Sequence, residues 1–201
     1  RGEKRAVTLS DGSTIRMNYE TEVRVPGKFA GNERIVYLSG HAHFDVVKDT
    51  NRPFIIYTED SKTQVLGTSF DINTKEEETE IVVTSGRVAF SEREKSENLV
   101  TLTVDDRAVL NKNIIRTDRV DASKLTAWNR DQLLFDGESL QEVIKVLEPW
   151  FNIQVTVKND SLLKEDFKIS LDNPSVVEAL DEIAFLASCN YHLEGRTVVF
   201  Y

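Results

Sequence analysis

One short motif in this sequence, Gly67-Thr68, has residue types that could carry out a covalent reaction. Because Gly67 has no side chain, the Thr68 hydroxyl can approach the Gly67 carbonyl group. Attack there is an N→O acyl shift, which turns a peptide bond into a hydrolysable ester. The alternative is structural, with Gly67 placed at a bulge between two strands. The residues alone leave both interpretations open.

A second set of chemically capable residues is His41, His43 and Asp45. Their spacing of two places all three on one face of a predicted strand, while Ala42 and Phe44 lie on the opposite face. Imidazole and carboxylate groups in this arrangement could bind a divalent metal ion. No fourth ligand is recognisable, so an exposed polar strand face is the alternative.

Other signatures of catalysis are missing from the sequence. It contains no glycine-rich phosphate loop, no G-x-S-x-G motif and no H-E-x-x-H motif. The single cysteine, Cys189, excludes an intrachain disulfide and a multi-cysteine zinc site. We therefore predict a protein that is not an enzyme acting on a separate substrate, and that needs no cofactor.

The charge distribution narrows the classes of partner. The net charge is −9, and residues 128–201 contribute most of it, with 13 acidic and 6 basic side chains. Such an acidic segment argues against nucleic acid and against direct contact with an anionic membrane surface. It suits a protein partner with a basic face, or it serves solubility alone. No apolar run approaches the roughly 18 residues that a membrane-spanning helix needs.

Residues 1–126 have the pattern of an all-β domain. About ten short alternating segments follow one another from residue 7 to about 117, separated by turn residues and without a helical period. This predicts a β-sandwich or a β-wrap. The charged runs at 75–80 and 92–95 are predicted as solvated hairpin tips.

Residues 127–201 contain an internal repeat. Residues 134–147 are echoed by residues 170–183, with Ser139 matching Ser175 and Glu142 matching Glu178 at an offset of 36. Each copy reads as strand, turn, amphipathic helix and strand, which predicts two βαβ units with two helices on one small sheet. The second helix is predicted to begin near Pro174. The fold class is thus α+β: an all-β domain followed by a small domain of two βαβ units.

The predicted start of the second helix has two candidate caps. Either Asn173 caps it, or Ser175 and Glu178 form a capping box, and the sequence does not decide between them.

The second domain contains no catalytic residues between its two units, which favours protein docking over catalysis. An extended segment of a partner could add to an exposed strand edge. We predict that edge at residues 153–157 or 197–200. The candidate contact residues are Ile153, Val155, Val157, Thr197, Val198, Val199 and Phe200.

Several segments together resemble the FecR-type family of bacterial transmembrane anti-sigma factors, most closely its Bacteroidetes branch. They are residues 9–14, 29–46, 52–54, 65–70, 127–128 and 135–147. The resemblance implies a β-rich FecR domain at 1–126. It also implies a second domain at 127–201 similar to the short N-terminal domain of secretins and TonB-dependent transducers.

The resemblance also implies a function and a location. Members are anchored in the inner membrane, and a short cytoplasmic segment binds an extracytoplasmic-function sigma factor. Their periplasmic region is expected to meet the signalling domain of an outer-membrane TonB-dependent receptor. The sigma-binding segment and the membrane helix are missing here, so this chain resembles the periplasmic sensor region. It is not expected to bind the sigma factor itself.

Two local features qualify the resemblance. Similar proteins more often carry Glu and an aromatic residue where this chain has His41 and His43. Some members are similar to proteins that cleave themselves between the Gly and Thr matched here by Gly67 and Thr68, which raises the weight of the acyl-shift interpretation.

Two functions of other classes remain. A carbohydrate-binding β-sandwich with an accessory α/β domain requires exposed aromatic side chains or a calcium site on residues 1–126. The aromatic residues mostly fall on the apolar side of the strands, which favours the core. A hydrolase has the weakest support of the three.

Overall fold

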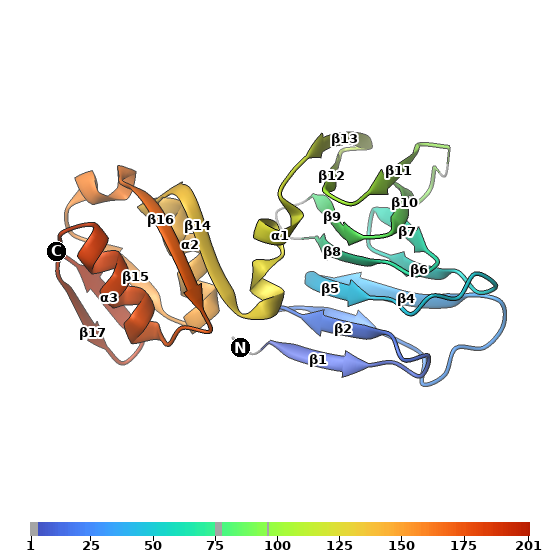
Figure 1. Cartoon of the computed structure of the whole chain (residues 1–201), viewed down its shortest axis with the longest axis horizontal. Helices are drawn as coiled ribbons and strands as arrows, with labels where there is room; N and C mark the ends of the chain where they lie inside the picture. Colours follow the sequence, from blue (N-terminus) through green and yellow to red (C-terminus); the bar gives the residue numbers. More distant parts are fainter. Residues whose placement is uncertain (1–3, 75–77, 96) are drawn as a thin grey trace. The chain divides into compact units, whose positions relative to one another are not determined.

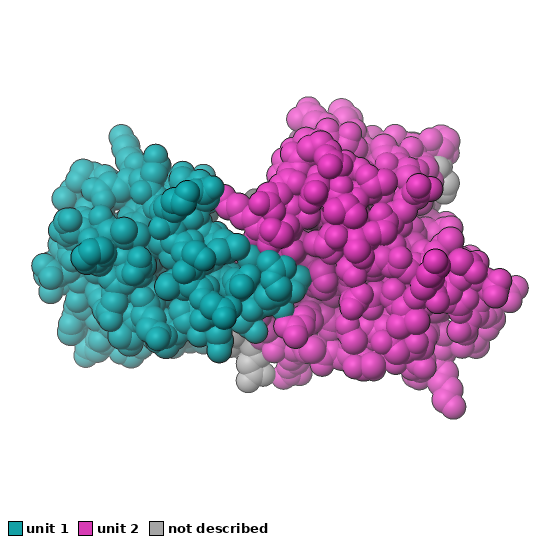
Figure 2. Space-filling model, viewed as in Figure 1, with its two compact units in different colours: residues 1–2, 127–201 teal, residues 3–126 magenta. Residues whose placement is uncertain are grey.

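The computed structural model describes residues 4–74, 78–95 and 97–201, which form two compact units that meet in sequence between Thr126 and Ala127 (Figures 1 and 2). Strands predominate and helices are few, which confirms the prediction of an α+β chain with a mostly β first part. Among the described residues, no helix is both long enough and apolar enough to cross a lipid bilayer.

The first unit is built from two sheets (Figure 1). The seven-stranded sheet is antiparallel throughout, in the order β1 (Arg5–Thr8), β2 (Thr14–Met17), β5 (His41–Asp45), β8 (Ser69–Asn73), β9 (Thr79–Ser85), β12 (Asp106–Asn111) and β13 (Ile114–Arg119). The six-stranded sheet has the order β11 (Leu99–Thr103), β10 (Arg87–Glu92), β7 (Ser61–Val65), β6 (Phe54–Tyr57), β4 (Arg34–Ser39) and β3 (Glu22–Arg24). In the second sheet only the β4–β6 pair is parallel.

One hydrophobic core lies between these sheets. It takes Phe44 and Phe70 from one sheet and Phe54 and Phe90 from the other, all fully buried. The Phe44 and Phe70 rings stack with their centroids 5.4 Å apart. Two sheets that share one core in this way form a β-sandwich, one of the two architectures that the strand pattern predicted.

The two charged segments can be compared with their predictions. Of the predicted tip at 75–80, residues 75–77 lie outside the described part of the chain, and β9 begins at Thr79. In the second tip, Glu92 ends β10 and residues 93–95 are exposed. The segment 121–128 forms a short helix, α1 (Ala122–Leu125), and the start of the 3-10 helix η1 (Ala127–Arg130).

The second unit follows the predicted order of elements. It contains β14 (Gln132–Ser139), α2 (Leu140–Phe151), β15 (Gln154–Val157), the 3-10 helix η2 (Asp160–Lys164), β16 (Asp166–Asp172), α3 (Val176–Leu186), β17 (Tyr191–Glu194) and β18 (Thr197–Phe200). The buried faces of α2 and α3 share one core, to which Leu140, Leu147, Leu180 and Ile183 contribute.

The single small sheet predicted for this unit is wrong. β14 pairs with β16, and β15, β18 and β17 form a separate three-stranded sheet. The two strands of each strand-helix-strand repeat therefore lie in different sheets. β14 pairs with β16, and β15 with β18, across the two copies, a long-range choice that the local hydrophobic pattern does not encode.

The repeat offset reappears in the strand register. Leu134 pairs with Ser170, its equivalent 36 residues later. The flanking pair Gln132–Asp172 becomes the pair Lys168–Asp136 when each residue is replaced by its equivalent in the other repeat. The β14–β16 ladder is therefore symmetric about an axis at Leu134 and Ser170. The first strands of the two repeats are thus related by a local pseudo-two-fold axis.

Both helices begin with the same capping box. The Ser139 hydroxyl accepts from the Glu142 amide while the Glu142 carboxylate accepts from the Ser139 amide, and Ser175 and Glu178 do the same in α3. This decides the open question of the second cap, because Asn173 lies in the preceding turn with a φ of +46°. The helix begins at Val176, two residues after Pro174, near which it was predicted to begin.

Candidate functional site

Gly67 and Thr68 lie between β7 and β8, where the backbone passes close to Lys48. A Cβ atom on Gly67 would lie 2.6 Å from the Lys48 Cα, so this close approach requires glycine. The buried Thr68 hydroxyl donates a hydrogen bond of 2.9 Å to the Arg87 carbonyl oxygen. A peptide carbonyl does not accept a proton as a general base, so the hydroxyl must turn before it can attack the Gly67 carbonyl.

The Gly67–Thr68 peptide group also lies very close to Gly86. A Cβ atom on Gly86 would lie 2.9 Å from the Thr68 Oγ1 and 3.0 Å from the Gly67 carbonyl oxygen. The nucleophile and the carbonyl oxygen of the predicted reaction therefore both face the bare Cα of Gly86, whose φ is +78°.

His41 and His43 lie on the same face of β5, as predicted, and both bond to Asp71 of β8. His41 Nε2 lies 3.1 Å from one Asp71 carboxylate oxygen, and His43 Nδ1 bonds to the other. Asp45 lies further along β5, is exposed, and accepts a hydrogen bond of 2.7 Å from the Ser69 hydroxyl. Within the described ranges, no three His, Cys, Asp or Glu side chains are grouped so that they could bind a metal ion.

The Asp71 carboxylate is almost completely buried. Burial acts to raise its pKa, but the hydrogen bonds from His41 and His43 outweigh that effect and lower the pKa below the usual 3.8. Asp71 is about 30 residues away in sequence, and only the β5–β8 register places it opposite His43. For that reason the sequence pattern showed the two histidines but not their partner.

The predicted docking strand at Thr197–Phe200 does not present an edge. It forms β18, the central strand of its sheet, with β15 on one side and β17 on the other. Val198 and Phe200 are fully buried. Strand addition at Thr197, Val198, Val199 and Phe200 is therefore not available, because both rows of their backbone groups are already paired.

The other predicted strand, β15, is at the edge of that sheet, but part of its edge is occupied. The amide of Ile153 donates to the Glu148 carbonyl oxygen at 3.0 Å, and the amide of Val155 donates to the Glu148 carboxylate at 2.9 Å. Val155 and Val157 are half-buried against the core of the unit. A partner that pairs with β15 must therefore displace the Glu148 side chain.

The structure shows an exposed apolar surface that the sequence pattern did not predict, on the outer side of α3. Phe185 is 79 % exposed, and Val177 and Leu186 are also exposed. Acidic residues accompany them on the helix: Glu178, Asp181 and Glu182. We call these six residues the α3 surface.

The matching positions of α2 carry different chemistry. Pro149 corresponds to Phe185, and Lys145 corresponds to Asp181, at the repeat offset of 36. At these two positions α2 thus lacks the aromatic ring and the acidic charge. This surface could have been found in the sequence by aligning the two repeats and comparing only the helix positions outside the buried apolar face.

Two family models match the chain. The model described as FecR protein matches residues 1–89, and the model described as FecR, C-terminal matches residues 132–200. Together they account for more than three quarters of the sequence. No curated protein shows significant similarity to the chain.

Solved structures are similar to the chain over its whole length. Two crystal structures of a candidate anti-sigma factor from Parabacteroides distasonis ATCC 8503, at 1.65 Å and 2.50 Å resolution, are each 28 % identical to it. Their TM-scores are 0.78 and 0.77, and the match covers 100 % of this chain and 95 % and 94 % of theirs. With both family models matched in order, this chain belongs to the FecR-type family of anti-sigma factors.

Proposed function

We propose that this chain is the periplasmic sensor region of an inner-membrane anti-sigma factor. In this proposal residues 1–126 form the FecR domain and residues 127–201 form the receptor-docking domain. The docking domain receives a signal from the signalling domain of an outer-membrane TonB-dependent transducer. The signal then passes to an extracytoplasmic-function sigma factor, which a cytoplasmic segment outside this chain would bind.

The observation that carries the docking step is the exposure of Phe185 on α3. A phenylalanine residue that is 79 % exposed contributes little to the core, whereas aromatic anchors supply much of the energy of protein interfaces. The surrounding carboxylates of Glu178, Asp181 and Glu182 select a partner with a basic rim around an apolar pocket. The β15 edge, with Val155 and Val157, is a second contact in this proposal.

A pull-down with the receptor's signalling domain tests the proposal, using the full chain and the receptor whose gene neighbours it. Replacing Phe185 with serine (F185S) should weaken capture about tenfold or more, because the anchor ring is lost. Val146 of α2 provides a matched control, since it is an exposed apolar residue on the pseudo-equivalent helix. The V146S variant should bind like the unmodified chain.

The possible outcomes distinguish an error in the proposed binding surface from an error in the proposed partner. Equal capture of F185S and the unmodified chain would remove α3 from the interface and leave the β15 edge. If the unmodified chain does not capture the signalling domain at all, the assignment of the partner is wrong.

Self-cleavage between Gly67 and Thr68 is a second activity in this proposal. Thr68 Oγ1 would bond to the Gly67 carbonyl carbon, the Gly67–Thr68 C–N bond would break, and the hydroxyl proton would pass to the new Thr68 amine. Water would then hydrolyse the ester to a Gly67 carboxylate and restore the Thr68 hydroxyl. Its support is that Gly86 leaves one side of both reacting groups without a side chain.

Intact-mass measurement during a long incubation tests this reaction. Cleavage should yield two fragments that add up to the full chain plus one water, be lost in T68A and be retained in T68S, which keeps a hydroxyl. A single full-length mass that never changes would count against the reaction and leave Gly67 with its structural role beside Lys48.

A further inference from the structure

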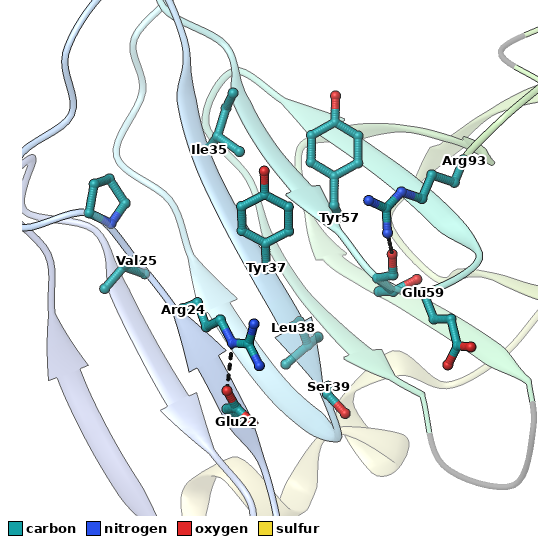
Figure 3. Close-up of a pocket in the computed structure, with 12 residues that line it drawn as sticks. Glu22, Arg24, Val25, Ile35, Tyr37, Leu38, Ser39, Tyr57, Glu59 and Arg93 are labelled. Carbon is teal, nitrogen blue, oxygen red and sulfur yellow. Dashed lines mark hydrogen bonds and ion pairs between the residues drawn. The ribbon is translucent and has the colours of Figure 1, made fainter.

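A groove of about 760 Å³ lies on the outer face of the six-stranded sheet, on the side away from the core (Figure 3). Residues of β3, β4 and β6 line it, together with Arg93, which follows β10. Along β4 the side chains alternate, so Val36 is buried in the core while Tyr37 points into the groove. The groove belongs entirely to the first unit.

Two tyrosines form an aromatic floor in this groove. Tyr37 and Tyr57 are direct neighbours in the parallel β4–β6 pair. Their ring centroids lie 5.8 Å apart and their planes differ by 27°. Figure 3 shows the two rings side by side, with their faces turned the same way. The Tyr37 residue is 47 % exposed, so its ring is available to a ligand.

The polar groups around the floor are balanced in charge. The Arg93 guanidinium lies 5.5 Å from the centre of the Tyr57 ring and donates to the Thr58 carbonyl oxygen at 2.8 Å. Arg24 forms an ion pair of 2.6 Å with Glu22, and Glu59 is the second acidic residue of the lining. The lining of the groove thus contains two arginines and two glutamates. This balance disfavours a phosphate, a polyanion or a cation as the ligand.

The sheet edge beside the groove disfavours an extended peptide. The edge strand β3 has three residues, and Pro26, which also lines the groove, follows shortly after it. A short edge strand flanked by proline offers few free backbone groups for strand addition. The ligand must therefore be recognised by side chains.

We propose that this groove binds a short neutral oligosaccharide. The C–H faces of pyranose rings are apolar and flat, and they stack on accessible aromatic rings such as the exposed Tyr37 and the half-buried Tyr57 beside it. The hydroxyl groups at the ring edge can bond to both kinds of charged side chain, with Arg93 donating and Glu59 accepting. The volume falls within the range of small-ligand sites. This site does not depend on the proposed receptor contact, which uses the other unit.

The experiment titrates the full chain by calorimetry with four neutral probes: cellohexaose, maltohexaose, laminarihexaose and mannohexaose. Trigalacturonic acid serves as the anionic comparison. At least one neutral probe should bind, and binding should fall roughly tenfold or more in Y37A and Y57A, because each loses one stacking face. Y37F keeps the ring and should keep most of the affinity. Y201A removes an exposed tyrosine outside the groove and should bind like the unmodified chain.

Three results would overturn the proposal. The first is that no neutral probe binds at millimolar concentration. The second is that a probe binds equally well to Y37A and Y57A, which places its site elsewhere. The third is that Y37A leaves every glycan titration unchanged but abolishes capture by the receptor's signalling domain, which makes the groove a protein contact. Thermal unfolding followed by circular dichroism shows that each variant is folded before it is titrated.

Discussion

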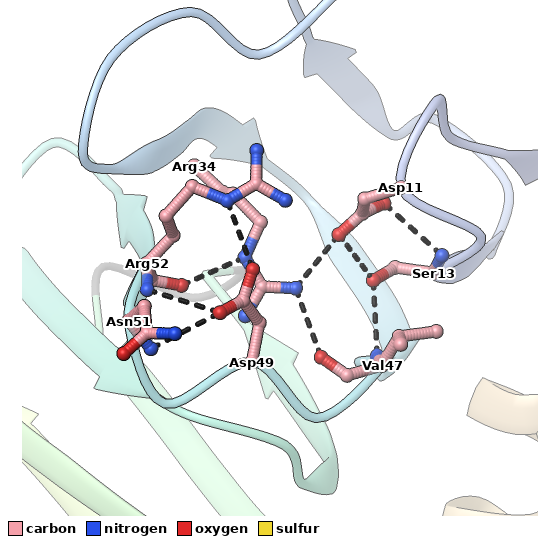
Figure 4. Close-up of polar contacts among 7 residues, drawn as sticks. All are labelled: Asp11, Ser13, Arg34, Val47, Asp49, Asn51 and Arg52. Atoms are coloured by element: carbon pink, nitrogen blue, oxygen red, sulfur yellow. Dashed lines mark hydrogen bonds and ion pairs between the residues drawn. The ribbon is translucent and has the colours of Figure 1, made fainter.

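The buried ion pair between Arg34 and Asp11 joins distant parts of the first unit (Figure 4). Arg34 Nη1 donates to an Asp11 carboxylate oxygen at 2.8 Å and to the Val47 carbonyl oxygen at 2.9 Å, and Nε donates to the Arg52 carbonyl oxygen at 2.9 Å. The guanidinium also lies 5.3 Å from the centre of the Phe54 ring. One arginine therefore ties the β1–β2 turn, the start of β4 and the 47–52 loop together.

Replacing Asp11 with asparagine should strongly destabilise the first unit. The change leaves the Arg34 charge buried without its counter-charge, and losing one partner of such a pair costs about 3 kcal/mol or more of unfolding free energy. Urea unfolding at neutral pH measures the loss. D49N is the matched control, because the Asp49–Arg52 pair is much more exposed, and its effect should be far smaller. Equal losses in both variants would show that burial of the Asp11 pair is not what matters.

The pairing of Asp71 with two histidines predicts a dependence of stability on pH. Because the folded pKa of Asp71 is lowered below the usual 3.8, its carboxylate stabilises the fold fully above that value. This contribution is lost as the pH falls through the lower, folded pKa. The difference in unfolding free energy between the unmodified chain and D71N should therefore shrink as the pH falls below 3.8. A difference that grows on acidification would contradict the assignment.

At the scale of single residues, the sequence predicted which face of a strand a side chain occupies more reliably than which residue that side chain contacts. It placed His41 and His43 together on the outer face of a strand, because side chains alternate locally. It could not supply Asp71 or the Asp11–Arg34 pair, since these contacts depend on which strands become neighbours. The same limit applied to Tyr37 and Tyr57, which share the groove only through the parallel β4–β6 register.

At the scale of elements, the two capping boxes should contribute equally to the stability of the second unit. Their serines occupy equivalent positions, and loss of a side-chain cap costs about 1 kcal/mol. S139A and S175A should therefore each lower the unfolding free energy by a similar amount in urea titrations. S170A changes an exposed serine within β16 and serves as the control. If only one cap mattered, the two repeats would differ in their energetic role despite their shared geometry.

The helices of the second unit were predictable, whereas its sheets were not. Periodic apolar residues and the S-x-x-E pattern are local, and both helices formed where these signals lie. The sheet arrangement depends on β14 pairing with β16, and on β18 lying between β15 and β17. Short alternating strands carry no information about the order in which they assemble. That is why Val198 and Phe200 were predicted at an edge and are found in the core.

At the scale of the whole molecule, each unit has its own hydrophobic core, so each should fold without the other. Residues 127–201 produced alone should melt in one cooperative transition by circular dichroism, and residues 1–126 should do the same. An unfolded fragment in either case would show that the boundary at Thr126 and Ala127 does not separate independent domains. Calorimetry of the full chain provides the comparison, because its unfolding profile should be the sum of the transitions of the two fragments.

The general architecture followed from the sequence because strand-rich and helix-containing segments are separated along the chain. An uninterrupted series of short alternating segments predicted the first unit, and the duplicated helices predicted the second. The count of thirteen strands in the described part of the first unit exceeded the estimate of about ten.

The symmetric β14–β16 ladder has a consequence for how this domain arose. In a lone copy of either repeat the first strand, β14 or β16, would have no partner, since each is completed by the strand of the other copy. An unduplicated ancestor would have been complete only as a homodimer, with identical strands meeting across a two-fold axis.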